Sequence, residues 1–307
     1  MKIIDTHCDT LTEIFNKKEK LYKNNLHISI EQMKTYQGYA QFFACFLAPE
    51  FKEHAREYAC SAFNNFFLEI KENDEEIEIA KSYDEYINIL SKGKIASFLS
   101  IEGGEVIEKI EDVEFFYNLG VRMMALTWNY DNKIASGVLG DERRGVTEYG
   151  RQVLDEMNRL NILCDVSHLN EKSFWDIAEY SKKTFEASHS NAYSVCNNKR
   201  NLKDEQIKEI IRRKGFVGIN LYPYFLTDTN TAKISDVLKM IEYFLSIGGE
   251  DIIGLGCDFD GVDVLPYNIS GICDLEKIFE EMAKIGYSKE LIDKIAHKNC
   301  ENMLKLF

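Results

Sequence analysis

The chain has 307 residues, of which 45% are hydrophobic and 29% are charged, and its formal net charge is −14. This composition is typical of a globular protein with a large core and argues against long disordered stretches. The acidic balance argues against binding to nucleic acid or to anionic membranes. No apolar run approaches the roughly 20 residues of a membrane span, and no signal peptide opens the sequence, so a cytoplasmic location is expected.

Short apolar runs alternate with longer amphipathic segments along the whole chain. Eight strands are predicted, at residues 2–6, 39–47, 95–100, 122–127, 162–167, 184–188, 216–220 and 252–257. Helices are predicted between and after them, at 53–72, 84–90, 106–119, 147–160, 171–181, 204–213, 234–247, 275–285 and 289–306. Near-continuous apolar strands alternating with helices are typical of a parallel sheet that is buried on both faces.

Eight such units predict an α/β fold in the form of a (β/α)8 TIM-type barrel, closed by a C-terminal helix and forming a single domain over residues 1–307. The alternative architecture is an open, doubly wound sheet. Its nucleotide-binding versions are disfavoured, because neither a Gly-x-Gly-x-x-Gly motif after the first strand nor a phosphate-binding loop motif occurs.

His7 and Asp9 follow the first predicted strand and are the first candidates for chemistry. Side chains two residues apart in an extended chain point to the same side, so these two should converge. An imidazole beside a carboxylate suits a borderline cation such as zinc. A His-x-Asp pair is common by chance, however, and alone it carries little weight.

Four further polar residues lie just past the ends of other predicted strands. They are Glu102, His168, His189 and Asp258. Taken singly, each is also explained as a structural residue, since such histidines are often only hydrogen-bonded and such aspartates often cap turns. In a barrel, the carboxyl ends of all strands open onto one face, where active sites are built. Six such residues on one rim therefore predict a common site.

The segments around these positions resemble the membrane dipeptidase (renal dipeptidase) family of zinc peptidases, within the amidohydrolase-like barrels. The resemblance covers nearly the whole chain, through the segments 5–9 (DTHCD), 101–104 (IEGG), 188–196 (SHSNAYSVC) and 256–261 (GCDFDG). The last two segments are long and highly specific. The secretion signal, lipid anchor and disulfide pattern of the ectoenzymes are not found, so the resemblance indicates a soluble, bacterial-type member.

The resemblance implies a binuclear metal-dependent dipeptidase that holds two divalent ions, expected to be Zn²⁺. His7 and Asp9 would bind one ion, and His168 and His189 would bind the other. Glu102 would bridge the two. The substrate would be a small dipeptide, with a D-residue allowed on the C-terminal side, and a homodimer is expected.

The resemblance also implies how a substrate is held. Asp258 would carry protons and hold the substrate amine, Arg200 would bind the terminal carboxylate, and Tyr222 would line the same pocket. One position departs from the family pattern: mammalian members carry a histidine that contacts the scissile carbonyl where this chain has Trp128. The neighbouring Asn129 is therefore a candidate substrate contact.

Two alternatives stay open on the sequence alone. One is another amidohydrolase-type activity, such as a lactonase, a deaminase or a phosphotriesterase-like hydrolase. Those barrels often bridge their metals with a carboxylated lysine, and no lysine stands at an obvious strand end here. The other is an inactive metal-binding scaffold, which Trp128 favours and the intact Asp258 opposes.

Overall fold

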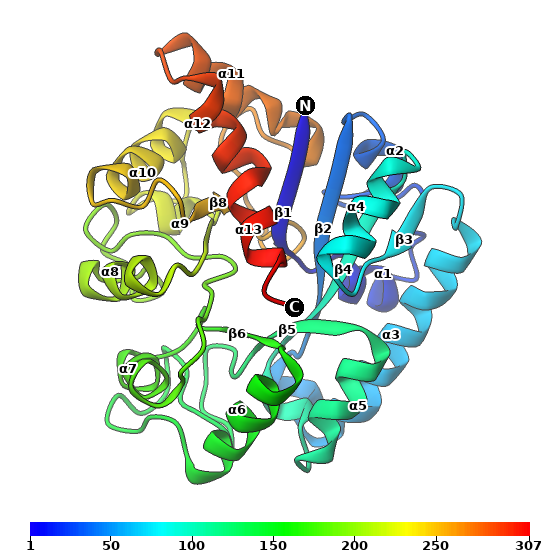
Figure 1. Ribbon diagram of the computed structural model, residues 1–307, viewed down its shortest axis with the longest axis vertical. Helices are drawn as coiled ribbons and strands as arrows, with labels where there is room; N and C mark the ends of the chain where they lie inside the picture. Colours follow the sequence, from blue (N-terminus) through cyan, green and yellow to red (C-terminus); the bar gives the residue numbers. More distant parts are fainter.

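The computed structural model describes residues 1–307 and shows a ring of strands with helices packed around its outside (Figure 1). Seven strands pair in parallel in the order β6-β5-β4-β2-β1-β8-β7. Their bounds are β1 Lys2–Cys8, β2 Gly38–Phe46, β4 Ile95–Glu102, β5 Val121–Ala125, β6 Leu163–Asp165, β7 Val217–Ile219 and β8 Ile253–Leu255.

The segment 184–188 closes the ring between β6 and β7. Asp165 of β6 pairs with Glu186, and Ala187 pairs with Val217 of β7, each through a single parallel bridge. The predicted TIM-type barrel is therefore confirmed, although its sixth member is too short to form a regular strand. A further short strand, β3 (Ile77–Ile79), pairs with the beginning of β4 outside the ring and has no counterpart among the predicted strands.

The predicted helices are present with shifts at their ends. They are α3 Ala55–Glu72, α4 Tyr83–Ser91, α5 Glu111–Leu119, α6 Glu148–Leu160, α7 Glu171–Tyr180, α8 Asp204–Arg213, α10 Ile234–Ser246 and α11 Glu276–Lys284. Three short helices were outside the prediction: α1 Thr10–Lys17, α2 Ile30–Met33 and α9 Pro223–Leu226. None of the helices combines the length and the apolar character that a membrane crossing needs.

Two of the predicted helices differ more clearly from the structure. The helix predicted from residue 106 begins only at Glu111, because the Asp112 carboxylate accepts the backbone N–H groups of Glu108 and Lys109 and so holds a turn ahead of it. The C-terminal helix is divided into α12 (Lys289–Asp293), a π-helical turn (Lys294–Lys298) and α13 (Asn299–Leu304).

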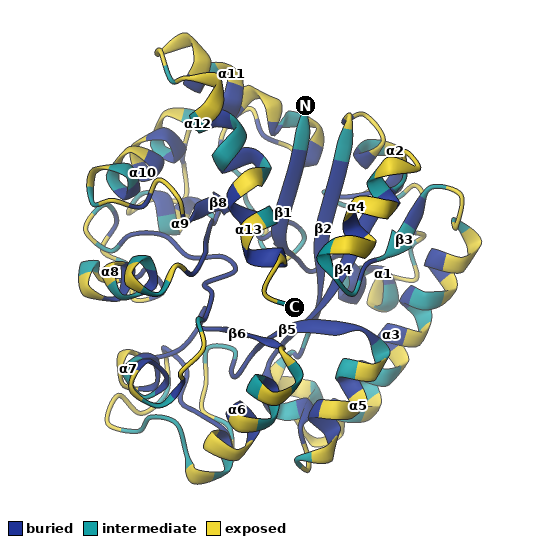
Figure 2. Ribbon diagram, in the orientation of Figure 1, coloured by how far each residue is buried: buried dark blue, intermediate teal, exposed yellow.

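The barrel interior is apolar at the amino ends of the strands. Ile4, Phe42, Phe98 and Phe216 belong to a cluster of 14 buried residues that Met303 and Leu304 of α13 complete. A second cluster of 72 buried residues fills the layer between the strands and the surrounding helices. Figure 2 shows the result: apart from β3 and the starts of β1 and β2 the strands are mostly buried, and the helices expose their outer faces. The polar residues at the carboxyl ends of the strands therefore sit above a closely packed and mostly apolar floor.

We expect the substitution Phe98→Ala to destabilise the protein by about 3–5 kcal/mol, because it leaves a cavity where Phe98 stacks on Phe42 with 4.7 Å between ring centroids. Tyr267→Ala is the matched control, since Tyr267 is 71% exposed and should cost less than about 0.5 kcal/mol. Denaturant unfolding measures both changes, and equal costs for the two variants would contradict this account of the core.

Candidate metal centre

The six strand-end residues predicted to converge do so, and all are buried, with exposed fractions between 0% and 9%. They come from β1 and the turn after it, from the end of β4, and from the loops that follow β6, the segment 184–188 and β8. The ends of β1 and β8 are tied together by backbone hydrogen bonds from Asp9 to Phe259 and from Asp258 to His7. Parallel pairing thus places residues that are up to 251 positions apart side by side.

His168, His189 and Glu102 form the most compact part of the site. Nε2 of His168 lies 2.7 Å from Nε2 of His189 and 2.6 Å from Oε1 of Glu102, and Nε2 of His189 lies 3.7 Å from the same oxygen. The hydrogen bonds on the far side of both rings decide which of their nitrogens carry protons.

Both rings donate from Nδ1, so their Nε2 atoms are left as acceptors. Nδ1 of His168 donates to the amide oxygen of Asn129 at 2.8 Å. Nδ1 of His189 donates to Oγ of Ser188 at 2.7 Å, because that hydroxyl already donates to the carboxylate of Asp165. Two lone pairs and a carboxylate oxygen that face each other in a buried site repel unless a cation lies among them. Orienting partners of this kind are typical of histidines that bind metal.

His7 is the centre of a second group. Its Nε2 atom lies 3.3 Å from Glu102, 3.7 Å from Asp9 and 3.7 Å from Asp258. Nε2 of His7 and Oδ1 of Asp9 are buried without a hydrogen-bond partner. The structure therefore contains two overlapping groups in which all ligand atoms lie within 4.8 Å of one another: His7, Glu102 and His189, and His7, Asp9 and Asp258. Imidazole and carboxylate are ligands that suit zinc and similar ions.

The electrostatics of the site also favour a bound cation. Burial lowers the pKa of His168 and, more strongly, that of His189, so both rings are neutral. Burial acts in the same direction on His7, but the carboxylates of Glu102 and Asp9 outweigh it and raise the pKa of His7 to about 10. A proton on His7 therefore offsets part of the negative charge, and a divalent cation would compete with that proton for the same lone pair.

Two residues of the site have strained backbone conformations. His168 and Asp258 have φ angles of 70° and 63°, in the left-handed region that costs a non-glycine residue roughly 1–2 kcal/mol. Gly261 approaches the site so closely that a Cβ atom there would lie 2.4 Å from Asp258 and 2.7 Å from Asp9. Strain and close approach of this kind are typical of positions that are selected for function.

A cavity of about 310 Å³ opens onto the two groups, and the predicted substrate contacts line it. Arg200 is 8% exposed, its Nη2 atom donates to Nε2 of His168 at 3.1 Å, and its Nε atom has no partner. Tyr222 and Asn129 are also in the wall, Asn129 with its amide oxygen engaged by His168. Trp128 lines the same cavity, with its ring centroid 6.3 Å from that of His168, so the position that departs from the family pattern faces the site.

Several residues support the metal-facing side chains, and Ser188, Asp165 and Asn220 among them were not predicted from the sequence. Ser188 and Asp165 hold His189 as described above, and Nδ2 of Asn220 donates to Oδ2 of Asp258 at 2.9 Å. Asp5 acts through the backbone, because its Oδ1 atom accepts the N–H groups of His7 and Cys257. Ser188 and Asp165 lie within strand-end segments that the sequence does single out, but nothing in the sequence shows which of them contact one another.

A TIM-type barrel whose strand ends bring together buried imidazoles and carboxylates around a cavity defines a metal-dependent hydrolase. The sequence model of the membrane dipeptidase family, peptidase family M19, matches residues 1–306, and the chain therefore belongs to that family. It is a metallodipeptidase, as its sequence predicts.

Known relatives agree with this assignment. An uncharacterized dipeptidase of Schizosaccharomyces pombe is 29% identical over 315 residues, which cover 92% of this chain and 74% of the relative. A metallopeptidase from Rhodobacter sphaeroides, solved with a phosphinate mimic of the dipeptide L-Ala-D-Ala, has a TM-score of 0.91 at 26% identity and covers 99% of both chains. A solved M19 metallopeptidase described as dipeptidase AC has a TM-score of 0.92 at 27% identity, covering 99% of this chain and 98% of the other.

Metal affinity should fall as the pH is lowered. His7 with a pKa of about 10 is protonated at neutral pH in the metal-free protein, so metal binding must displace that proton. We expect the affinity for Zn²⁺ to rise about tenfold per pH unit between about pH 6 and pH 8. Competition with a coloured chelator measures the Zn²⁺ affinity at each pH. The variant His297→Gln, which lies outside the site, should show the same change of affinity with pH. An affinity that does not change with pH would contradict the claim that Zn²⁺ displaces a proton from His7.

Proposed function

We propose that the protein uses two divalent cations, expected to be Zn²⁺, to hydrolyse dipeptides. We also propose that it accepts dipeptides in which an L-residue is followed by a D-residue. The observation that carries the proposal is the buried cluster of imidazoles and carboxylates at the cavity floor, in which Glu102 lies 3.3 Å from His7, 2.6 Å from His168 and 3.7 Å from His189. The choice of substrate is supported by the L-Ala-D-Ala mimic bound to the relative from Rhodobacter sphaeroides. The expected homodimer, cytoplasmic location and single-domain organisation belong to the same proposal.

The proposed ligands are those implied by the sequence. His7 and Asp9 would hold one ion, and His168 and His189 would hold the other. Glu102 suits a bridging role, because one carboxylate oxygen lies 2.6 Å from His168 and the other lies 3.3 Å from His7. Cations held by these residues would supply Lewis acidity to the scissile carbonyl and to the attacking water.

Asp258 is the proposed proton carrier. Its Oδ2 atom is held by Asn220, whereas its Oδ1 atom lies 3.7 Å from Nε2 of His7 and faces the ligand group. A carboxylate fixed on one side and free on the other can accept a proton from water and return it to the leaving amine. Its negative charge also attracts the substrate ammonium group.

Arg200 is the proposed partner of the substrate carboxylate. Its guanidinium group lies in the cavity wall, with Nη2 3.1 Å from Nε2 of His168 and Nε without a partner. A metal ion on Nε2 of His168 would release Nη2, so that both donors could bind a carboxylate. A guanidinium group binds a carboxylate through two parallel hydrogen bonds, which fixes the length of substrate that fits. Tyr222 and Asn129 would line the same subsite, and Trp128 would cover the scissile bond where mammalian relatives place a histidine.

Metal removal should abolish dipeptide hydrolysis, and Zn²⁺ should restore it. The purified protein is stripped with a chelator, assayed on L-Ala-D-Ala and L-Ala-L-Ala, and reloaded while metal content is measured. Full activity in protein shown to be free of metal would contradict the proposal. An intact, fully loaded protein that cleaves no dipeptide would favour the scaffold alternative.

The substitution Asp258→Asn should lower kcat by about 10²–10⁴-fold, because it removes the proton carrier while preserving its shape. Metal content should stay unchanged, whereas its loss would make Asp258 a metal ligand. Asp251→Asn is the matched control, because Asp251 is exposed and pairs only with the surface residue Lys294. Steady-state kinetics and metal analysis on the same samples separate these outcomes.

A further inference from the structure

The turn that carries Asp258 is strained and needs partners that hold it. Asp258 and Asp260 have φ angles of 63° and 66°, in the left-handed region that residues with a side chain rarely adopt. Such conformations persist only where the surrounding structure fixes them. Backbone hydrogen bonds with His7 and Asp9 fix Asp258 and Phe259, so the second half of the turn depends on other contacts.

Those contacts come from His27 and Thr10. Oδ1 of Asp260 accepts the backbone N–H of His27 at 2.6 Å, and Oδ2 accepts the hydroxyl of Thr10 at 2.6 Å. The backbone N–H of Asp260 in turn donates to Nδ1 of His27 at 2.9 Å. Nδ1 is therefore an acceptor, and the ring is neutral with its proton on Nε2. The side chain of Asp260 is 2% exposed, so water cannot readily replace these bonds.

His27 is anchored independently of its ring. It lies in the loop between α1 and α2, and its backbone carbonyl accepts the N–H of Ile272 at 3.2 Å. A Cβ atom at Gly271 would lie 2.6 Å from the same carbonyl oxygen, so the two loops are in close contact. The next residue, Ile28, is fully buried. The ring, which is 27% exposed, thus presents Nδ1 to Asp260 from a fixed backbone.

Gly261 connects Asp260 to the metal centre. It packs directly against the carboxylates of Asp258 and Asp9, and its N–H donates to the carbonyl oxygen of Asp258 at 3.2 Å. A shift of Asp260 would carry Gly261 with it and change the space that the Asp258 carboxylate occupies. The hydrogen bonds of Asp260 therefore bear on the orientation of Asp258.

We propose that His27 and Thr10 are positioning residues that keep the carboxylate of Asp258 in place for proton transfer. They act through Asp260. None of these three supporting residues lines the cavity of about 310 Å³ that opens onto the metal centre (the metal-side cavity), so they do not touch a substrate there. The inference rests on the proposed function, because that function makes Asp258 the proton carrier.

The test measures kcat on L-Ala-D-Ala together with metal content, for the Zn²⁺-loaded protein and its variants. His27→Ala leaves the buried N–H of Asp260 without an acceptor, and we expect kcat to fall about tenfold at unchanged metal content. His27→Asn should stay within about twofold of the unsubstituted protein, because Oδ1 of asparagine can take the place of Nδ1. Thr10→Val removes the hydroxyl that Asp260 binds and should resemble His27→Ala.

A double substitution separates positioning from a general loss of stability. If His27 acts through Asp258, His27→Ala should change kcat by less than about twofold in protein that already carries Asp258→Asn. A merely structural role would lower kcat by the same factor in both backgrounds. His54→Ala is the matched control, because His54 is exposed and makes no capping hydrogen bond to α3, and it should leave kcat unchanged.

The outcomes separate the inference from the proposed function. An unchanged kcat in His27→Ala, or an equal loss in the Asp258→Asn background, overturns the positioning role and leaves the proposed function standing. A loss in His27→Asn as large as in His27→Ala overturns the role of the Nδ1 acceptor. Loss of metal from His27→Ala means that the contact acts on Asp9 and overturns the assignment to Asp258. An unsubstituted, loaded protein that cleaves no dipeptide overturns the proposed function and this inference with it.

Discussion

The site depends on a positive charge that neutralises the imidazole lone pairs and the carboxylates buried at the strand ends. Pairing of parallel strands forces His7, Glu102, His168 and His189 into one volume from which water is largely excluded. In a low-dielectric interior such groups cost several kcal/mol each unless a positive charge neutralises them. The hydrogen bonds behind the rings keep their lone pairs facing inward, so the fold preserves this unfavourable arrangement and makes it a site for cations.

Much of this arrangement could be predicted from the sequence, because the information is local. A buried parallel strand is a short apolar run, and its end is marked by the first polar residues after it. His7, Glu102 and Asp258 each occupy such a position. Because the carboxyl ends of all barrel strands lie on one face, these residues can be assigned to a common site before any distance is known. The six strand-end residues could be named because each adjoins a segment of this kind.

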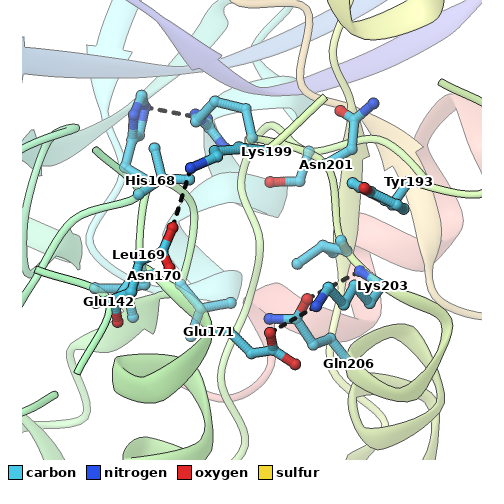
Figure 3. Close-up of a pocket in the computed structure, with 15 residues that line it drawn as sticks. Glu142, His168, Leu169, Asn170, Glu171, Tyr193, Lys199, Asn201, Lys203 and Gln206 are labelled. Carbon is cyan, nitrogen blue, oxygen red and sulfur yellow. Dashed lines mark hydrogen bonds and ion pairs between the residues drawn. The ribbon is translucent and has the colours of Figure 1, made fainter. Parts of the chain in front are cut away.

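The remaining features depend on contacts between distant segments. The bond from Ser188 to Asp165 and the bond from Asn220 to Asp258 join neighbouring members of the barrel, and no spacing along the chain shows them. The segment 184–188 was predicted as a strand from its composition, yet it pairs with β6 and with β7 through one bridge each. A cavity of about 400 Å³ that shares Arg200 and His168 with the metal-side cavity lies mainly between loops (Figure 3), and the hydrophobic pattern does not determine the paths of loops.

The position of α13 has a consequence for how the molecule forms. Met303 and Leu304 pack against the apolar interior from below, in the same buried cluster as Ile4. The floor of the barrel therefore stays open until α13 packs against it. This closure joins residues about 300 positions apart, and contacts over such a separation in sequence slow folding.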